Sequence, residues 1–209
     1  MVLADLGADV VKVERPGVGD ETRSWGPPYA GSESAYYLSI NRSKRSVALN
    51  LKDPRALELA LELCAGADVV IENFRAGAAD AMGLGYEALC ERNEQLVYCS
   101  ITGFGSDRAP AGRPGYDFIA QAESGLMNVT GDAEPTKVGV AIVDVLTGVH
   151  AAVAILAALQ GGGPRRVEVS LIDTALASLV NVVSGALVTG SEPGRYGNAH
   201  PHIVPYQPF

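Results

Sequence analysis

The chain has few of the features that build disulfide frameworks or direct a protein to secretion. Its three cysteines, Cys64, Cys90 and Cys99, are far apart and form no C-x-x-C pair. This spacing excludes a disulfide framework and is typical of buried thiols in a reducing compartment. The first residues include an acid and no basic segment before an apolar run, so no signal peptide is predicted. We therefore expect a cytoplasmic protein.

The chain also lacks an excess of positive charge. The formal net charge is −8, which argues against nucleic acid as a partner. The longest weakly polar stretch, residues 175–188, is interrupted by Ser178, Asn181 and Ser184. It is too short and too polar for a membrane span. The sequence thus predicts neither a nucleic-acid partner nor a membrane partner.

The composition is that of a globular protein. Of 209 residues, 47% are hydrophobic and 19% are charged, which excludes a disordered chain and provides for a substantial core. Charge is unevenly distributed: residues 12–55 hold eight basic and five acidic residues, a net charge of +3. A basic segment in an acidic protein suits a small polyanionic ligand such as a nucleotide diphosphate, although ordinary solvated loops show the same pattern.

Strand and helix patterns alternate along the chain. Asp53 and Pro54 provide an N-cap and first position for a helix that Gly66 ends. Alternation of this kind predicts an α/β fold with a Rossmann-like, mainly parallel, doubly wound sheet. We expect one large domain over residues 1–190 and a turn-rich linker over residues 191–209. The expected strands cover residues 10–14, 68–72, 96–101, 138–143 and 166–170. The expected helices cover 53–66, 76–82, 86–92 and 116–127, followed by a helix that runs from the strand 138–143 to Gln160 and a last helix capped by Ser170 and Asp173.

Asp144 is the most informative single residue. It follows the apolar run 138–143, which is typical of a buried strand, and precedes the apolar stretch 149–159, which is typical of a core helix. Open α/β sheets place catalytic groups at such strand-to-helix junctions, and a carboxylate there can attack an activated acyl group. The alternative is a helix N-cap, and base rates favour the cap when the residue is considered alone.

Three polar groups could bind a ligand. Residues 72–75 (Glu-Asn-Phe-Arg) follow an expected strand and offer an amide, an aromatic face and a guanidinium, which suit a base and a phosphate. Residues 42–45 are basic, and residues 113–117 lead into an expected helix. Taken singly, each group is more typical of structure than of function. No phosphate-binding glycine loop, nucleophile elbow or metal-ligand cluster accompanies them.

The order of these motifs is more specific than any one of them. The chain contains, in sequence, seven motifs: residues 10–17, 19–20, 22–23, 41–46, 72–75, 115–117 with 121–125, and Asp144 with Thr147 and Gly148. Together they resemble the class III CoA-transferase family, the formyl-CoA transferase and carnitine CoA-transferase group. The resemblance extends over essentially the whole chain, and it is specific for the family without indicating one substrate.

The resemblance implies a function and a set of site residues. It implies transfer of coenzyme A between an acyl-CoA and a carboxylic acid, with Asp144 as the nucleophile, no permanently bound cofactor and an interlocked homodimer. The family's large domain is Rossmann-like and is joined to a small domain; by comparison, this chain lacks the first strand and the small domain. The positions that match the family's CoA-binding residues are Arg15, Leu49, Asn50, Leu51, Lys52, Asn73, Phe74, Arg75, Pro114, Gly115 and Tyr116.

Tyr116 separates two branches of this family. The racemase branch has a histidine at the matching position, where it helps to move a proton. A phenol, with a reference pKa of about 10, is a poor base at neutral pH. The transferase interpretation is therefore favoured. Two alternatives stay open: an α-methylacyl-CoA racemase-like enzyme, and an inactive fragment that binds CoA or mediates dimerisation.

Overall fold

The structure is a computed structural model that describes residues 1–107 and 113–206. The chain divides into two compact units. Unit 1 comprises residues 1–70, 80–97 and 162–165, and unit 2 comprises residues 71–79, 98–161 and 166–209. Several strands have residues in both units. Each unit is described by itself below.

Unit 1 is built around a pair of parallel strands. Strands β1 and β4 pair in parallel, with Val10 opposite Lys44 and Glu14 opposite Ala48. Helix α3 follows β4 and begins as its sequence predicts, because the Asp53 side chain accepts a hydrogen bond from the Arg55 N–H and Pro54 occupies the first turn. The elements of this unit are α1 (Val2–Asp5), β1 (Val10–Glu14), the 3₁₀ helix η1 (Glu21–Ser24), β2 (Tyr29–Ala30), β3 (Glu33–Ser34), α2 (Ala35–Asn41), β4 (Lys44–Ala48), α3 (Pro54–Ala65) and α5 (Tyr86–Arg92).

Unit 2 combines a three-stranded sheet with a group of helices. The strand order is β5-β6-β7, and the central strand is buried on both faces, since Tyr98 and Cys99 are nearly inaccessible. Some residues of β5, α4, β6 and β7 are assigned to unit 1. The elements are β5 (Val69–Glu72), α4 (Ala78–Ala81), β6 (Val97–Thr102), α6 (Asp117–Glu123), α7 (Leu126–Val129), α8 (Ile142–Gly161), β7 (Arg165–Ser170), α9 (Leu171–Ser178) and α10 (Val180–Thr189).

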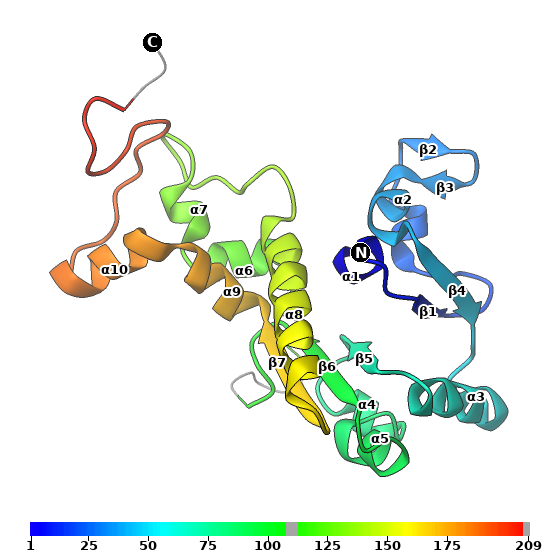
Figure 1. The fold of residues 1–209 in the computed structure, drawn as a ribbon. Coiled ribbons are helices and arrows are strands. Elements are labelled where there is room, and N and C mark those ends of the chain that lie inside the picture. The colour runs from blue at the N-terminus through cyan, green and yellow to red at the C-terminus, as the bar shows by residue number, and fades with distance from the viewer. Residues whose placement is uncertain (108–112, 207–209) are drawn as a thin grey trace. The chain divides into compact units, whose positions relative to one another are not determined.

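A small apolar cluster joins three helices of unit 2. Ala120 of α6, Val143 of α8, and Leu171 and Ala175 of α9 are all buried against one another. Figure 1 shows α6 beside the beginning of α8, with α9 next to both. The cluster therefore fixes the first turn of α8 relative to α6.

Most of the elements expected from the sequence are confirmed. The structure has an α/β fold with parallel strand pairing, and α3, α5, β1, β5, β6 and β7 agree with expectation to within a residue or two at each end. The Ser170 cap is also present, since its side chain accepts a hydrogen bond from the Asp173 N–H. These elements have either clear caps or runs of β-branched residues, which are strong local signals.

The strand expected over residues 138–143 is wrong. The chain is irregular up to Ala141, and helix α8 begins at Ile142. The Val138 N–H donates to the side-chain oxygen of Gln121, and Val140 is 61% exposed. Apolar character alone cannot separate a buried strand from a helix and its lead-in. Asp144 consequently lies within a helix, not at a strand-to-helix junction.

Two expected helices are each divided. The helix expected over residues 116–127 breaks at Gly125, whose φ of 82° lies in the left-handed region that glycine favours, and becomes α6 and α7. The last helix is divided near Val180, which has a φ of 39°, into α9 and α10.

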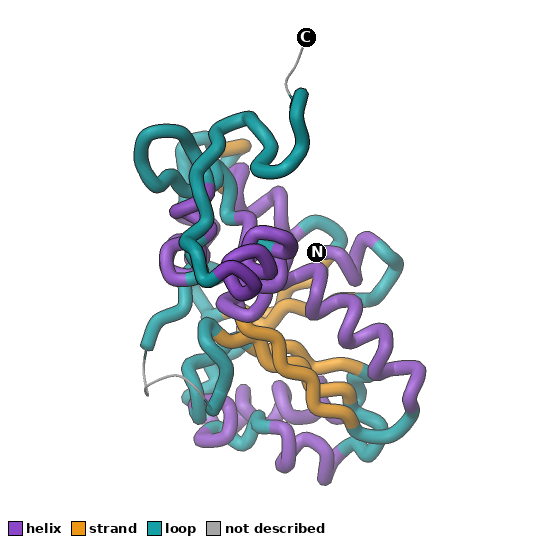
Figure 2. The backbone as a smooth tube through the Cα atoms, turned by 90° about the vertical axis from the view of Figure 1, so that its left-hand side faces the viewer, coloured by secondary structure: helices purple, strands orange, loops and turns teal. Residues whose placement is uncertain are grey.

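Helix α8 is long and apolar. Over the described residues it is the one single helix with the length and composition to cross a membrane, and α9 and α10 pass the same test only as a pair bent by 79°. Core helices of soluble proteins pass this test too, so the absence of a membrane partner stays a prediction. The prediction of one domain over residues 1–190 and a linker after it also stays a prediction. Described residues 190–206 contain no helix or strand (Figure 2).

Candidate active site

Asp144 lies in the first turn of α8, at its third residue. The preceding residue, Val143, is 1% exposed within the apolar cluster, whereas Asp144 itself is exposed. Neighbouring residues of a helix face different directions, so burial of Val143 leaves the Asp144 carboxylate at the surface. Among residues 1–107 and 113–206, no hydrogen bond or ion pair to that carboxylate is found.

The N-cap expected at Asp144 is supplied by a different residue. The Oδ1 atom of Asp117, at the start of α6, accepts hydrogen bonds from the N–H groups of Val143 at 2.8 Å and of Asp144 at 3.3 Å. The Oδ2 atom of Asp117 accepts from the amide of Gln121 at 2.6 Å. The capping alternative for Asp144 is therefore wrong, because a carboxylate from another helix satisfies these amides.

The environment of Asp144 favours its protonated form. Desolvation by the surrounding protein, and secondarily the negative charge of Asp117, raise the pKa of the Asp144 carboxyl to about 6. Solvent screens part of this effect because the residue is exposed. The negative charge of Asp117 acts in the same direction as the larger effect of desolvation. A carboxylate with a raised pKa in an accessible place is typical of a reactive group.

One further polar atom lies close to Asp144 along α8. Thr147 is 2% exposed, and its hydroxyl oxygen has no hydrogen-bond partner in the described part of the chain. Residues three apart on a helix share a face, so Thr147 lies one turn beyond Asp144. A buried hydroxyl without a partner is uncommon in folded proteins.

The turn that contains Pro114, Gly115 and Tyr116 is fixed to the end of β6 by a contact between two glycines. A Cβ on Gly115 would lie 2.2 Å from the Cα of Gly103, so neither position tolerates a side chain. Tyr116 follows at the N-cap of α6 with 66% of its surface exposed. The close approach thus sets the start of α6, from which Asp117 reaches α8.

Residues Asn73, Phe74 and Arg75 follow β5 directly and are all exposed. Glu72 shapes this segment, because its Oε2 atom accepts a hydrogen bond from the Phe74 N–H at 2.7 Å and its Oε1 atom accepts one from the Ser100 hydroxyl. Phe74 is 42% exposed, a large apolar side chain held at the surface. An aromatic face beside a guanidinium can bind a planar base and a phosphate.

In unit 1, Arg15 and the segment Leu49–Lys52 lie at the carboxyl ends of neighbouring strands. The Leu49 N–H donates to the Glu14 carbonyl at 2.9 Å, which places Leu49 beside Arg15. Asn50 forms a turn by accepting from the Lys52 N–H at 3.2 Å. The structure brings these predicted CoA-binding residues together. The carboxyl ends of parallel strands are the usual ligand-binding edge of α/β sheets.

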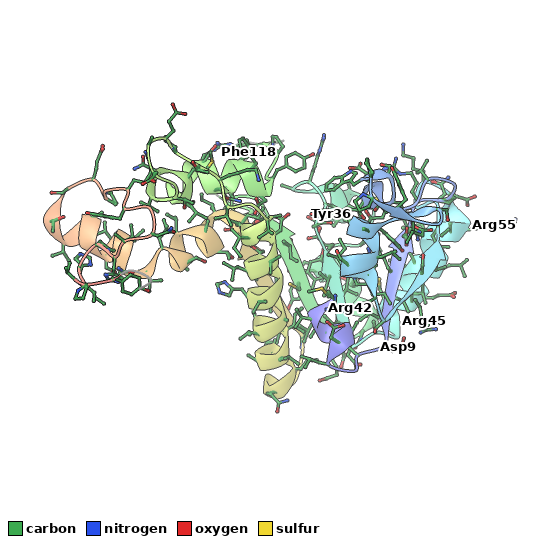
Figure 3. All side chains as sticks on the ribbon, turned by 90° about the horizontal axis from the view of Figure 1, so that it is seen from above. Asp9, Tyr36, Arg42, Arg45, Arg55 and Phe118 are labelled. Carbon is green, nitrogen blue, oxygen red and sulfur yellow. The ribbon has the colours of Figure 1, made fainter. Side chains whose placement is uncertain are left out.

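The cations of the basic segment fall into two groups. Arg45 pairs with Asp9 at 2.6 Å, a pair labelled in Figure 3, and Arg42 pairs with Asp5 at 2.5 Å. Arg15 and Lys52, by contrast, have no ion-pair partner among the described residues. Arg15 and Lys52 therefore remain available to bind a ligand's phosphates. The cluster at residues 42–45 is thus largely neutralised within the protein. The remaining paired cations are Lys12 with Asp20 and Arg23 with Glu14 and Glu33.

The predicted site residues are accordingly placed in two sets. Arg15 and Leu49–Lys52 belong to unit 1, and the segments 73–75 and 114–116 with Asp144 belong to unit 2. Their assignment to CoA binding and catalysis stays a prediction. Asp117 was not selected from the sequence as a site residue, although it stands in the motif Gly115–Asp117. The sequence could not have identified Asp117, because its role depends on which backbone N–H groups its carboxylate binds in the folded chain.

Comparison with known proteins now supplies the family. The family model described as CoA-transferase family III matches residues 1–209, the whole chain. The chain belongs to this family. The resemblance predicted from the ordered motifs is confirmed, and each motif named above falls inside the matched region.

Individual relatives agree with that assignment. The chain is 46% identical to the human succinyl-CoA:glutarate CoA-transferase over all of this chain and 49% of that protein. It is 45% identical to the succinate–glutarate CoA-transferase of Agrobacterium fabrum over 99% of this chain and 54% of that protein. The chain thus spans about half the length of the curated relatives it matches.

A solved structure confirms the fold. The crystal structure of a CAIB/BAIF family protein from Brucella suis matches with a TM-score of 0.91 and 46% sequence identity, covering 98% of this chain and 57% of that chain. At this similarity, the α/β architecture predicted from the alternating elements is established.

Proposed function

We propose that the protein is a CoA-transferase that moves coenzyme A from an acyl-CoA thioester to a free carboxylic acid through a covalent intermediate on Asp144. One observation carries the mechanism: the Asp144 carboxylate is exposed at the start of α8 beside a second carboxylate, and residues 1–107 and 113–206 supply it with no counter-cation. Membership of CoA-transferase family III supports the reaction class.

A carboxylate nucleophile accounts for the whole reaction. Asp144 attacks the thioester carbonyl carbon, the carbon–sulfur bond breaks, and CoA leaves as a thiolate, which yields a mixed anhydride. The thiolate then attacks the Asp144 carbonyl carbon and releases the first acid, which leaves an aspartyl-CoA thioester. The acceptor carboxylate repeats these two steps in reverse order and regenerates Asp144. No oxidant, metal or proton source is consumed.

The raised pKa of Asp144 suits this chemistry. With a pKa of about 6, about 90% of the side chain is ionised at pH 7. Its basicity, and with it the nucleophilicity of its oxygens, exceeds that of an ordinary aspartate. The ionised carboxylate can therefore attack without a separate general base.

The exposed cations and the aromatic ring suit coenzyme A. Arg15, Lys52 and Arg75 offer charged donors to phosphates, and Phe74 offers a surface for the adenine ring. The relatives named above act on succinyl-CoA with glutarate or are named for succinate and glutarate. We propose short dicarboxylic acids as the acceptor class, a homodimer as the assembly, and the cytoplasm as the location.

Trapping the covalent intermediate tests the proposal. The complete protein is incubated with succinyl-CoA and hydroxylamine, digested, and examined by mass spectrometry for an aspartyl hydroxamate. The expected product is a hydroxamate on Asp144. Asp173 is the internal control, because it occupies the same third position in the first turn of α9 and is held by Ser170. Transfer that proceeds with no hydroxamate on Asp144 would contradict the mechanism.

A further inference from the structure

Asp117 and Gln121 tie α6 to the whole segment that leads into α8. The Asp117 carboxylate binds the N–H groups of Val143 and Asp144. Gln121, which is completely buried, donates to Asp117 through its amide nitrogen and accepts from the Val138 N–H through its oxygen at 2.8 Å. Two side chains, one turn apart on α6, thus hold both ends of the stretch from Val138 to Asp144.

Because of these hydrogen bonds, the N-terminus of α8 does not stabilise the Asp144 carboxylate in the usual way. Free amides in the first turn of a helix normally stabilise a carboxylate there, by hydrogen bonding and through the helix dipole. The amides at the second and third positions of α8 are already bound by Asp117. The Asp144 carboxylate is therefore left without these donors and next to a like charge.

We propose that Asp117 is a positioning residue for the Asp144 nucleophile: by binding the first amides of α8 it holds Asp144 at the surface and keeps its carboxylate free of the helix's own donors. The inference rests on the proposed function of Asp144. It assigns to Asp117 a part in the reaction that needs no contact with the substrate.

The other charged groups near this junction are engaged elsewhere. Glu123, at the far end of α6, pairs with Arg113, and Asp173 on α9 is bound by Ser170. His150 lies further along α8, where its ring nitrogen is 3.5 Å from the Thr174 hydroxyl of α9. Among the described residues, Asp117 is the charged group that acts on Asp144.

The variant Asp117→Asn tests the charge while keeping a side-chain oxygen for the α8 amides. In the complete protein we would measure single-turnover formation of the Asp144 adduct from succinyl-CoA as a function of pH. Removing a like charge lowers the pKa of Asp144, so the acid limb should move down, by up to about one pH unit, since Asp117 is the smaller of the two causes of the raised pKa. The rate at neutral pH should fall about tenfold or more, because the Asp144 carboxylate is less basic and because asparagine cannot also accept the hydrogen bond from Gln121 that fixes this side chain. Binding of acyl-CoA, measured by calorimetry, should stay unchanged.

A matched control is Glu123→Gln, which removes a negative charge from the same helix without touching the α8 amides; it should keep the wild-type rate and acid limb. Asp117→Glu retains the charge but not the geometry, so it should keep the acid limb at a reduced rate. If Asp117→Asn fails to fold, Asp117→Glu is the test of the proposal. A wild-type rate for Asp117→Glu would overturn it.

The outcomes separate this inference from the proposed function. A folded Asp117→Asn protein with the wild-type rate and acid limb would overturn the positioning of Asp144 by Asp117, while the nucleophile itself would stand. A wild-type protein that transfers CoA without forming any Asp144 adduct would instead remove the proposed function, and this inference with it.

Discussion

Two carboxylates, one in each unit, have opposite surroundings. Glu14 in unit 1 is 6% exposed and accepts five hydrogen bonds, two of them from the guanidinium of Arg23 at 2.9 and 3.0 Å. Asp144 in unit 2 is exposed, has no such donors among the described residues, and lies near Asp117. The hydrogen bond from Arg23 lowers the pKa of Glu14 to about 2, whereas desolvation and Asp117 raise that of Asp144 to about 6.

The difference shows how neighbours separate a structural acid from a reactive one. Every acceptor site of Glu14 is used to connect β1, β4, η1 and α2, and the bend at Gly19 leaves no room for a side chain, since a Cβ there would lie 2.8 Å from Glu14 Oε2. A carboxylate so occupied is a poor nucleophile. Asp144 retains its lone pairs for an incoming carbonyl carbon.

The largest expected effect comes from removing the exposed carboxylate. Asp144→Asn in the complete protein should reduce CoA transfer by at least about a thousand-fold, because an amide cannot form the covalent intermediate. Coenzyme A affinity, measured by calorimetry, should remain within a small factor of wild type. Asp173→Asn, at the same helix position in α9, is the matched control and should retain activity. Residual transfer of more than a few per cent would mean that another group is the nucleophile.

For Glu14, the buried carboxylate, the main expected effect of substitution is on the stability of the protein. Glu14→Gln should lower the free energy of unfolding by about 3 kcal/mol, because it leaves the Arg23 guanidinium without its charged partner. Urea denaturation at pH 7 would measure this. Since the folded pKa of Glu14 is depressed to about 2, its stabilisation is present above the unfolded pKa and is lost as the pH falls towards 2.

Urea denaturation of the Asp144→Asn variant provides the comparison with Glu14→Gln. The folded pKa of Asp144 is raised to about 6, so any stabilisation it gives exists below the unfolded pKa and is lost as the pH rises through 6. Asp144→Asn should therefore not destabilise the protein at pH 7. Equal losses of stability in the two variants would show that both acids are structural.

A smaller effect is expected at the arginines, where paired and unpaired side chains can again be compared. Arg15→Gln and Arg75→Gln should each weaken coenzyme A binding about tenfold and reduce its salt dependence, because each removes a charge-assisted phosphate contact. Arg45→Gln is the control, since its guanidinium is already paired with Asp9, and such surface pairs contribute little. Unchanged affinity of the Arg15 and Arg75 variants at low salt would contradict their assignment.

The sequence by itself determined the features that depend on local chemistry or on ordered motifs. Asp53, Pro54 and Gly66 were enough to bound α3, because capping involves only residues close in the chain. The β-branched runs identified β1 and β5, and the order of seven motifs identified the family. Asp144 was selected as the central residue even though its predicted surroundings were wrong.

Only the tertiary structure decided what surrounds each charge. Local patterns predicted a strand over residues 138–143, because periodicity depends on apolar character alone. It does not indicate which groups hydrogen-bond to the backbone amides. The side chains of Asp117 and Gln121, 17 to 27 residues away in sequence, bind those amides and make the segment a lead-in to α8. In the same way, eight basic residues formed one segment in the sequence, yet folding paired some of them with acids. Arg15 and Lys52 have no ion-pair partner in the described part of the chain. Hydrogen bonds and ion pairs between distant residues depend on the fold, and they separate the structural charges from the available ones.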